Sequence, residues 1–592
     1  LTDTISHEIA HLLGYAHEPR LDTDHSPLGS VAAVLWDGGG DGTSWHDPLN
    51  WDGDAVPVDA DDVVISIADG DPVVAFSSAS GTRTVKSIVS DEAFAISGGS
   101  LTLSGGASEF RSDFSLTGGS LIASGAGTTL EVAGNTTIQN TAIRVQDNAF
   151  STFQTADTLT NVSLTASGGG QILFPVATRY AGWNQGDKTI QATGEGSRID
   201  LGSLETLVGG GTDPDYPYPW RYVHLEASDG GELVVSGVVS GHTIWTLDGP
   251  TSVLDVAGVT ELMGGATVAL GDGHTVEWSA ATALNYVSLT ASEDSVVLFP
   301  LVESLTNVNL TADGGSEILF PAATSYTGWR EADKTIQATG EGSRIDLGSL
   351  ETLVGGGTDP DYPYDWRYVR LKALEGGELV VSGAVSGHTV WTVDATGGVM
   401  NVTGVTSIGG YASITNTSNV LDFAACTSLS TVNLSAIAGG EILLPVATTY
   451  TGSSNYNTTI QATGEGSRID LGSLATLVGG GTDPDYPYPW RYVHLKALDG
   501  GDLNVGGAIS GHTTWTLDGP TSVLDVSGVK KLTGGATVTI GDGHTVEWTA
   551  ATNLDYVNLI VSEGAVVSFP VVERLTNVSL TASGGGQILF PV

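Results

Sequence analysis

The sequence predicts a mainly β protein, a right-handed parallel β-solenoid whose coils contain about 20–23 residues. Two observations lead to this fold: internal repeats whose lengths differ by a single coil, and short strand-like segments separated by glycine-rich turns. A third observation excludes a helical protein, because no stretch from Val31 onward keeps the 3.6-residue apolar period of a helix.

The internal repeats indicate a stack of equivalent layers. The string TIQATGEGSRIDLGSL begins at Thr189, Thr335 and Thr459, so its two successive intervals are 146 and 124 residues long. The difference of 22 residues is one coil, and a unit that can lose one coil consists of layers that contact mainly their neighbours. A β-propeller with blades of about 45 residues is the alternative fold, although losing 22 residues would halve one blade.

The long repeat unit itself divides into six steps. An apolar motif followed by a polar turn recurs at seven anchors: Leu164, Ala192, Leu225, Leu247, Leu270, Leu289 and Leu310. Segments such as VSLTA, QILFPV and SVLDVAG are rich in β-branched residues and leucine, which predicts two or three short strands per coil. With coils stacked at ~4.8 Å, about 17 coils between residues 159 and 574 would form a rod of roughly 80 Å.

Some residues are expected inside the solenoid. Val, Leu and Ile side chains stack inward between coils and drive folding. Trp245, Trp391 and Trp515 occupy the same place in their coils and are expected to form part of an internal stack. Cys426 occurs once and is expected to be a small buried apolar residue.

Charge and composition exclude several classes of partner. The 592 residues include 67 Asp and Glu against 21 Lys and Arg, which gives a formal net charge of −46. This charge would repel nucleic acid and anionic membranes, and no apolar run approaches the ~18 residues that cross a bilayer. The single cysteine excludes a disulfide framework.

Two insertions enlarge the longer coils. One is TRYAGWNQGDK, from Thr178 to Lys188, and the other is GGGTDPDYPYPWRY, which begins at Gly209 and recurs in similar form from Gly355 and Gly479. The second insertion supplies a candidate ligand platform: Tyr216, Tyr218, Trp220, Tyr362, Tyr364, Trp366, Tyr486, Tyr488 and Trp490. Such rings could stack on sugars, or they could simply cover apolar surface of the solenoid.

Two further features of the solenoid are interpreted as structural. Asp213 and Asp215 offer too few oxygens for a convincing calcium site, so calcium remains an unsupported possibility. His242, His388 and His512, each in an SGHT string, are interpreted as turn residues rather than metal ligands.

The strongest chemical signal lies in residues 1–20, which read LTDTISHEIAHLLGYAHEPR. A helix from Asp3 would place His7 and His11 on one face, where they can share a zinc ion. Gly14 would end the helix and let the chain return, so that His17 becomes a third ligand. Glu8 would then lie beside the metal as general base for a zinc-bound water.

This H-E-x-x-H-x-x-G-x-x-H pattern resembles the metzincin zinc metalloendopeptidases, a group that includes matrixins, astacins and serralysins. The resemblance implies that His7, His11 and His17 bind one catalytic Zn²⁺ and that Glu8 activates water for peptide-bond hydrolysis. Metzincins also have a five-stranded sheet before this helix and a methionine-containing turn beneath the metal. Only six residues precede His7, and Met263 and Met400 both fall within the repeats, so most of that domain is missing.

On this interpretation the chain is a fragment of a larger protein, because it begins inside one domain and ends inside a repeat. Its segments are a zinc-binding helix from a truncated metzincin domain (1–20), a linker leading into the solenoid (21–70), degenerate coils (71–158), a long unit of six coils (159–304), a short unit of five (305–428), a long unit of six (429–574) and the start of another unit (575–592).

The sequence therefore predicts part of an extracellular or cell-surface bacterial zinc metalloendopeptidase with a long acidic β-solenoid stalk. Its partners would be a protein or peptide substrate, and also an extracellular polysaccharide or further copies of itself. One alternative is a non-enzymatic adhesin-like repeat protein with a vestigial zinc motif. A weaker alternative is a carbohydrate-binding or carbohydrate-active β-helix that uses the Tyr and Trp loops.

Overall fold

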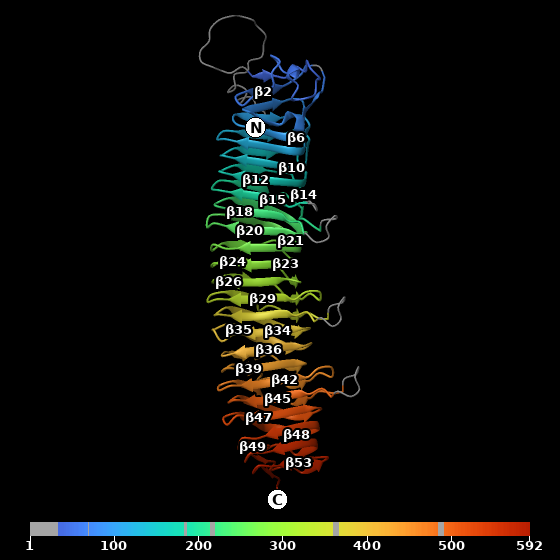
Figure 1. Cartoon of the computed structure of the whole chain (residues 1–592), viewed down its shortest axis with the longest axis vertical. Helices are drawn as coiled ribbons and strands as arrows, with labels where there is room; N and C mark the ends of the chain where they lie inside the picture. Colours follow the sequence, from blue (N-terminus) through green and yellow to red (C-terminus); the bar gives the residue numbers. More distant parts are fainter. Residues whose placement is uncertain are drawn as a thin grey trace.

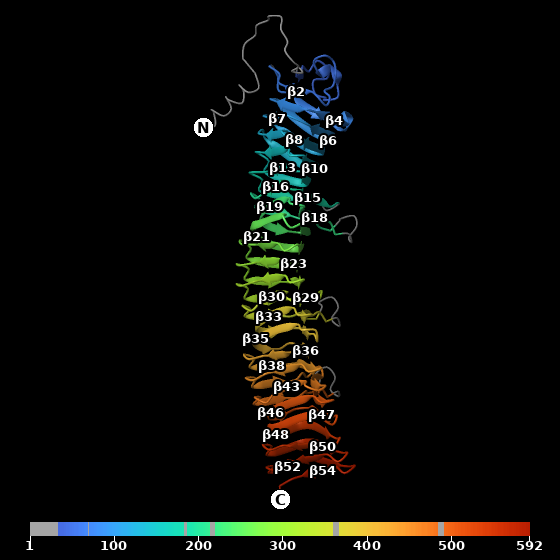
Figure 2. The ribbon, with the colours of Figure 1, turned by 90° about the vertical axis from the view of Figure 1, so that its left-hand side faces the viewer.

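The computed structural model describes residues 33–68, 70–182, 186–212, 220–358, 366–482 and 490–591. These residues are nearly all β and form a parallel β-solenoid of about 23 turns, stacked in one column (Figures 1 and 2). The predicted β-solenoid is confirmed and the propeller is not favoured, because the strands pair in parallel from coil to coil. The helix expected within residues 1–20 lies outside the described residues.

Helical structure is almost absent from the described part of the chain. Two single-turn 3₁₀ helices, η1 (Pro48–Asn50) and η2 (Ser78–Ser80), both precede the repeats. Within these ranges, no helix has the length and apolar character needed to span a membrane.

Each coil contributes strands to three parallel ladders. Through the repeats, ladder 1 contains β12 (Thr158–Ser167), β15 (Lys188–Thr193), β18 (Val223–Ser228), β20 (Thr243–Asp248), β21 (Val253–Leu270), β23 (Ala283–Ala291), β26 (Asn309–Asp313), β29 (Lys334–Thr339), β32 (Val369–Leu374), β34 (Thr389–Val393), β36 (Ala412–Thr417), β39 (Val432–Ile437), β42 (Thr458–Thr463), β45 (Val493–Leu498), β47 (Thr513–Asp518), β48 (Val523–Ile540), β50 (Asn553–Val561) and β53 (Ser579–Ala582).

Ladders 2 and 3 are built from shorter strands. Ladder 2 includes β13 (Gln171–Leu173), β16 (Arg198–Leu201), β19 (Glu232–Ser240), β24 (Val296–Leu298), β27 (Glu317–Leu319) and β30 (Arg344–Leu347). Ladder 3 includes β14 (Arg179–Ala181), β17 (Thr206–Val208), β25 (Ser304–Thr306), β28 (Ser325–Thr327) and β31 (Thr352–Val354). Some long strands, including β21, bend at the corners and take part in more than one ladder.

The register of ladder 1 refines the predicted anchors. Successive partners through the first long unit are Leu164, Ile190, Leu225, Trp245, Val268, Leu289 and Leu310. Four of the predicted anchors are these partners, whereas Ala192, Leu247 and Leu270 each lie two residues later. The displacement keeps them on the inward face, because side chains alternate along a strand with a period of two.

The short unit contains one coil fewer in the same ladder. From Leu310 the partners are Ile336, Leu371, Trp391, Ile414 and Leu434. The ladder thus closes over the missing coil without a break, as expected of layers that contact only their neighbours.

The inward side chains form a continuous apolar core with aromatic stacks. Trp245, Trp391 and Trp515 are at most 1% exposed, which confirms their predicted internal position. The ring centroid of Trp245 lies 5.5 Å from that of Trp278, which in turn stacks on Phe299 at 5.5 Å. Cys426 is also fully buried, as predicted, and burial raises the pKa of its thiol to about 11.

An aromatic cluster covers the first coils. Trp36, Trp45 and Trp51 are buried, and the ring of Trp45 packs against Trp51 with centroids 4.7 Å apart. The indole N–H of Trp51 donates a hydrogen bond to the backbone oxygen of Trp45 at 2.9 Å. Trp45 also contacts Phe76 and Phe94 of the coils beneath it, so these residues cover the end of the core.

Candidate functional site

The second insertion opens at the corner where the chain passes from ladder 3 to ladder 1. Its stem is held by two antiparallel bridges, Gly210 with His242 and Thr212 with Trp220. A Cβ atom on Gly210 would lie 1.9 Å from the backbone oxygen of Arg221, so only glycine permits this approach. The same bridges recur in the other two units, which explains the repeated glycines.

Of the predicted platform, the structure describes the three tryptophans. Trp220 is 48% exposed, Trp490 is 53% exposed and Trp366 is half-buried. The other predicted platform residues lie outside the described residues: Tyr216, Tyr218, Tyr362, Tyr364, Tyr486 and Tyr488.

Each tryptophan packs against a histidine of the next coil. The ring centroids of Trp220 and His242 are 4.1 Å apart, those of Trp490 and His512 are 4.0 Å apart, and those of Trp366 and His388 are 5.2 Å apart. The histidines lie at the corner, where each forms an antiparallel bridge with a glycine of the insertion, and they also form part of the aromatic surface. Partial burial lowers the pKa of His242, because desolvation disfavours the charged imidazole.

In each unit, a tyrosine that the sequence analysis did not single out lies further along the same corner. Tyr286, Tyr411 and Tyr556 have φ angles of 60°, 91° and 54°, a left-handed conformation that is unusual for a bulky side chain. Residues held in this region carry strain, and such strain is concentrated at functional sites. A signal was present in the sequence: LNYV from Leu284 replaces LTNV from Leu305, with Tyr in the place of Asn.

The first insertion of the following unit completes the corner. Buried Tyr326 anchors it by donating a hydrogen bond to the backbone oxygen of Val308 at 2.7 Å. Beyond this anchor, the ring of Trp329 packs edge-on against Tyr286, with centroids 4.9 Å apart. The Lys334 Nζ atom lies 5.0 Å from the centroids of both rings.

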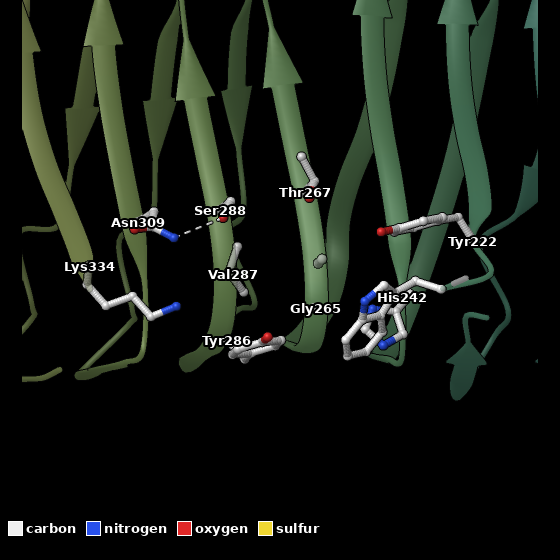
Figure 3. Close-up of a pocket in the computed structure, with 11 residues that line it drawn as sticks. Tyr222, His242, Gly265, Thr267, Tyr286, Val287, Ser288, Asn309 and Lys334 are labelled. Carbon is white, nitrogen blue, oxygen red and sulfur yellow. Dashed lines mark hydrogen bonds between the residues drawn. The ribbon is translucent and has the colours of Figure 1, made fainter. Parts of the chain in front are cut away.

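We call this surface the aromatic corner; it comprises Trp220, Tyr222, His242, Gly265, Tyr286, Trp329 and Lys334. In the first long unit it encloses a groove of about 280 Å³ (Figure 3). Figure 3 shows Gly265 and Tyr286 lying between His242 on one side and Lys334 on the other. Gly265 keeps the groove open, because a Cβ atom there would lie 2.6 Å from the His242 Nδ1 atom.

The short unit closes the corresponding groove. In the coil that follows His388, Tyr411 takes the place that Gly265 has in the long unit, just before the ladder 1 strand. The ring centroids of Tyr411 and His388 are 5.6 Å apart. Trp366 then contacts both Tyr411 and Tyr456, at 4.5 Å and 4.6 Å between centroids. The rings fill the space that remains open in the long unit.

The last long unit repeats the open arrangement. Trp490 and His512 are followed by Gly535 and then by Tyr556, which is 60% exposed. A second groove of about 240 Å³ lies here, lined by Gly535, Tyr556 and Asn577 among others.

The predicted zinc ligands and base lie outside the described residues: His7, Glu8, His11 and His17. Across the ranges that are described, no group of three or more His, Cys, Asp or Glu side chains is placed to hold a metal ion. The chain matches no family model, no curated protein and no solved structure.

Proposed function

We propose that the solenoid is an extracellular scaffold that binds a saccharide chain at the aromatic corner of its long units. The observation that carries this proposal is the half-exposed Trp220, which lines one groove together with Tyr286. Apolar C–H faces of sugar rings stack on Trp and Tyr, while hydroxyl groups bond to polar atoms nearby.

The exposure of the tryptophans favours ligand binding over a purely structural role. A loop whose aromatic rings only covered the solenoid would bury them, as Trp245 and Trp278 are buried in the core. Trp220 and Trp490 instead keep about half of their surface exposed. The groove lies near the lower end of the range of about 300–1,000 Å³ for small-molecule sites, which suits one or two sugar units of a longer chain.

The test is saccharide binding by the chain with Trp220 and Trp490 both changed to Ala. We expect at least a tenfold loss on a glycan array and in titrations with the best oligosaccharide, because Trp220 lines the groove of the first long unit and Trp490 is the equivalent exposed tryptophan of the last. Trp366→Ala is the matched control and should leave binding unchanged, since its ring belongs to the closed cluster. Equal binding by all variants, or no binding by the unmodified chain, would reject the proposal.

A zinc endopeptidase is a second candidate, supported by the motif in residues 1–20 and by nothing else in the chain. We expect one zinc ion per chain by mass spectrometry of metals, and loss of that zinc in His11→Ala, which removes a ligand. Glu8→Ala should keep the zinc but abolish casein cleavage, because it removes the general base. Zinc content that is the same with and without His11 would contradict the predicted metal site.

A further inference from the structure

The groove of the first long unit contains a buried lysine that has no charged partner among the residues that the structure describes. Lys334 is 5% exposed, and its contacts in the described part of the chain are with the rings of Tyr286 and Trp329. The neighbouring carboxylate of Asp333 is already used: it accepts hydrogen bonds from Arg370 at 2.7 Å and from the backbone N–H of Tyr368 at 2.8 Å. In a chain with 67 carboxylates and 21 basic residues, a buried lysine without a carboxylate is unusual.

The position of Lys334 directs its amine toward the groove. Its side chain extends along the floor toward Tyr286 and Val287, beside Ser288 and Asn309 (Figure 3). Asn309 is already bonded, because its Nδ2 donates to the Ser288 Oγ at 3.2 Å and its Oδ1 accepts from the Thr335 N–H at 2.9 Å. The amine is therefore the charged group of the groove that is left to recognise a ligand.

An ammonium group in this position is incompletely solvated. Burial lowers the pKa of Lys334, because water is removed from the charged form. The two aromatic rings compensate only in part, since a cation–π contact contributes about 0.5–2 kcal/mol. A carboxylate of the ligand would supply the missing partner as a charge-assisted hydrogen bond, which is roughly twice as strong as a neutral one.

We propose that the long-unit groove recognises an acidic sugar, a uronic acid whose carboxylate pairs with Lys334 while its ring stacks at the aromatic corner. This inference rests on the proposed saccharide-binding function and names the class of ligand. The net charge of −46 disfavours a densely charged polyanion. The ligand is therefore an isolated uronic acid within an otherwise neutral saccharide.

The test compares two ligands that differ only at the carboxyl group. One is aldotetraouronic acid, in which a single methylglucuronic acid is attached to three xyloses, and the other is the same molecule after its carboxyl group has been reduced to an alcohol. We expect the chain to bind the acid about tenfold more tightly, which corresponds to about 1.4 kcal/mol. Lys334→Gln should remove this preference, and Lys334→Arg should retain part of it.

The control variant is Lys372→Gln, a lysine on β32 outside the groove, which should keep the full preference. Circular dichroism and melting of each variant report whether the solenoid is intact. Equal binding of both ligands by the unmodified chain would overturn the acidic-sugar inference, and so would a preference for the acid that survives Lys334→Gln. Either result would leave the saccharide proposal standing. Failure of the chain to bind any saccharide would overturn both.

Discussion

Deleting residues 246–268 should leave a folded solenoid that has lost the groove of its first long unit. Trp245 and Val268 are partners in ladder 1, so joining Trp245 to Ala269 preserves the register of every following strand. The deletion removes the coil that carries Gly265 and places Tyr286 next to His242. This is the arrangement that Tyr411 and His388 already have in the short unit.

The expected result has two parts, which are measured separately. The far-UV circular dichroism spectrum should remain that of a β protein, and the melting temperature should fall by no more than a few degrees, since each coil contacts mainly its neighbours. Saccharide binding at the first groove should be lost, because aromatic rings would fill it.

The matched control removes residues 246–267, one residue fewer. The register then slips by one, which turns inward side chains of the joined strand outward and should destabilise the protein strongly. Aggregation of the 23-residue deletion, or equal stability of the two deletions, would contradict the interchangeability of the coils.

Changing Trp278 to Ala should cause the largest loss of stability expected from a single substitution in the repeats. Its side chain is fully buried between Trp245 and Phe299, and removing a large buried aromatic ring leaves a cavity that costs about 3–5 kcal/mol. Trp220→Ala should cost less than about 1 kcal/mol, because half of that ring is already in water.

Hydrogen exchange measures this loss coil by coil. The amides of β20, β23 and β24 should exchange faster in Trp278→Ala, because stability in a solenoid depends on neighbouring coils. Trp548 provides an internal reference in the same molecule, since it lies 5.6 Å from both Trp515 and Phe569 in an equivalent stack. Faster exchange around Trp548 as well would show that the coils unfold as a single unit.

The fold could be predicted from the sequence because its determining interactions repeat. The inward Val, Leu and Ile residues and the 22-residue difference between units together define a stack of coils. The anchors at Ala192, Leu247 and Leu270 were placed two residues late, because alternate residues of a strand are equally apolar when they face the same core. Pattern alone does not separate such positions, whereas backbone pairing does.

The aromatic corner could be predicted only in part. Trp220, Trp366 and Trp490 were found because their loop repeats, but Tyr286 and Lys334 belong to later coils and to a different insertion. Their approach to Trp220 depends on how many coils separate them. The open and closed grooves also differ at one position beside the histidine, which is Gly265 in the long unit and Tyr411 in the short one, and only the backbone pairing shows that these two positions are equivalent.

The closed short unit also determines how many ligands one molecule can hold at once. Trp220 and Trp490, the equivalent exposed tryptophans of the two long units, are separated by about 11 coils, or roughly 50 Å along the rod. A long polymer could therefore engage two sites on the same molecule, and the second contact would form at the high effective concentration set by the first. The gain in avidity would then depend on ligand length, and oligomers too short to bridge this distance would bind with the affinity of one groove.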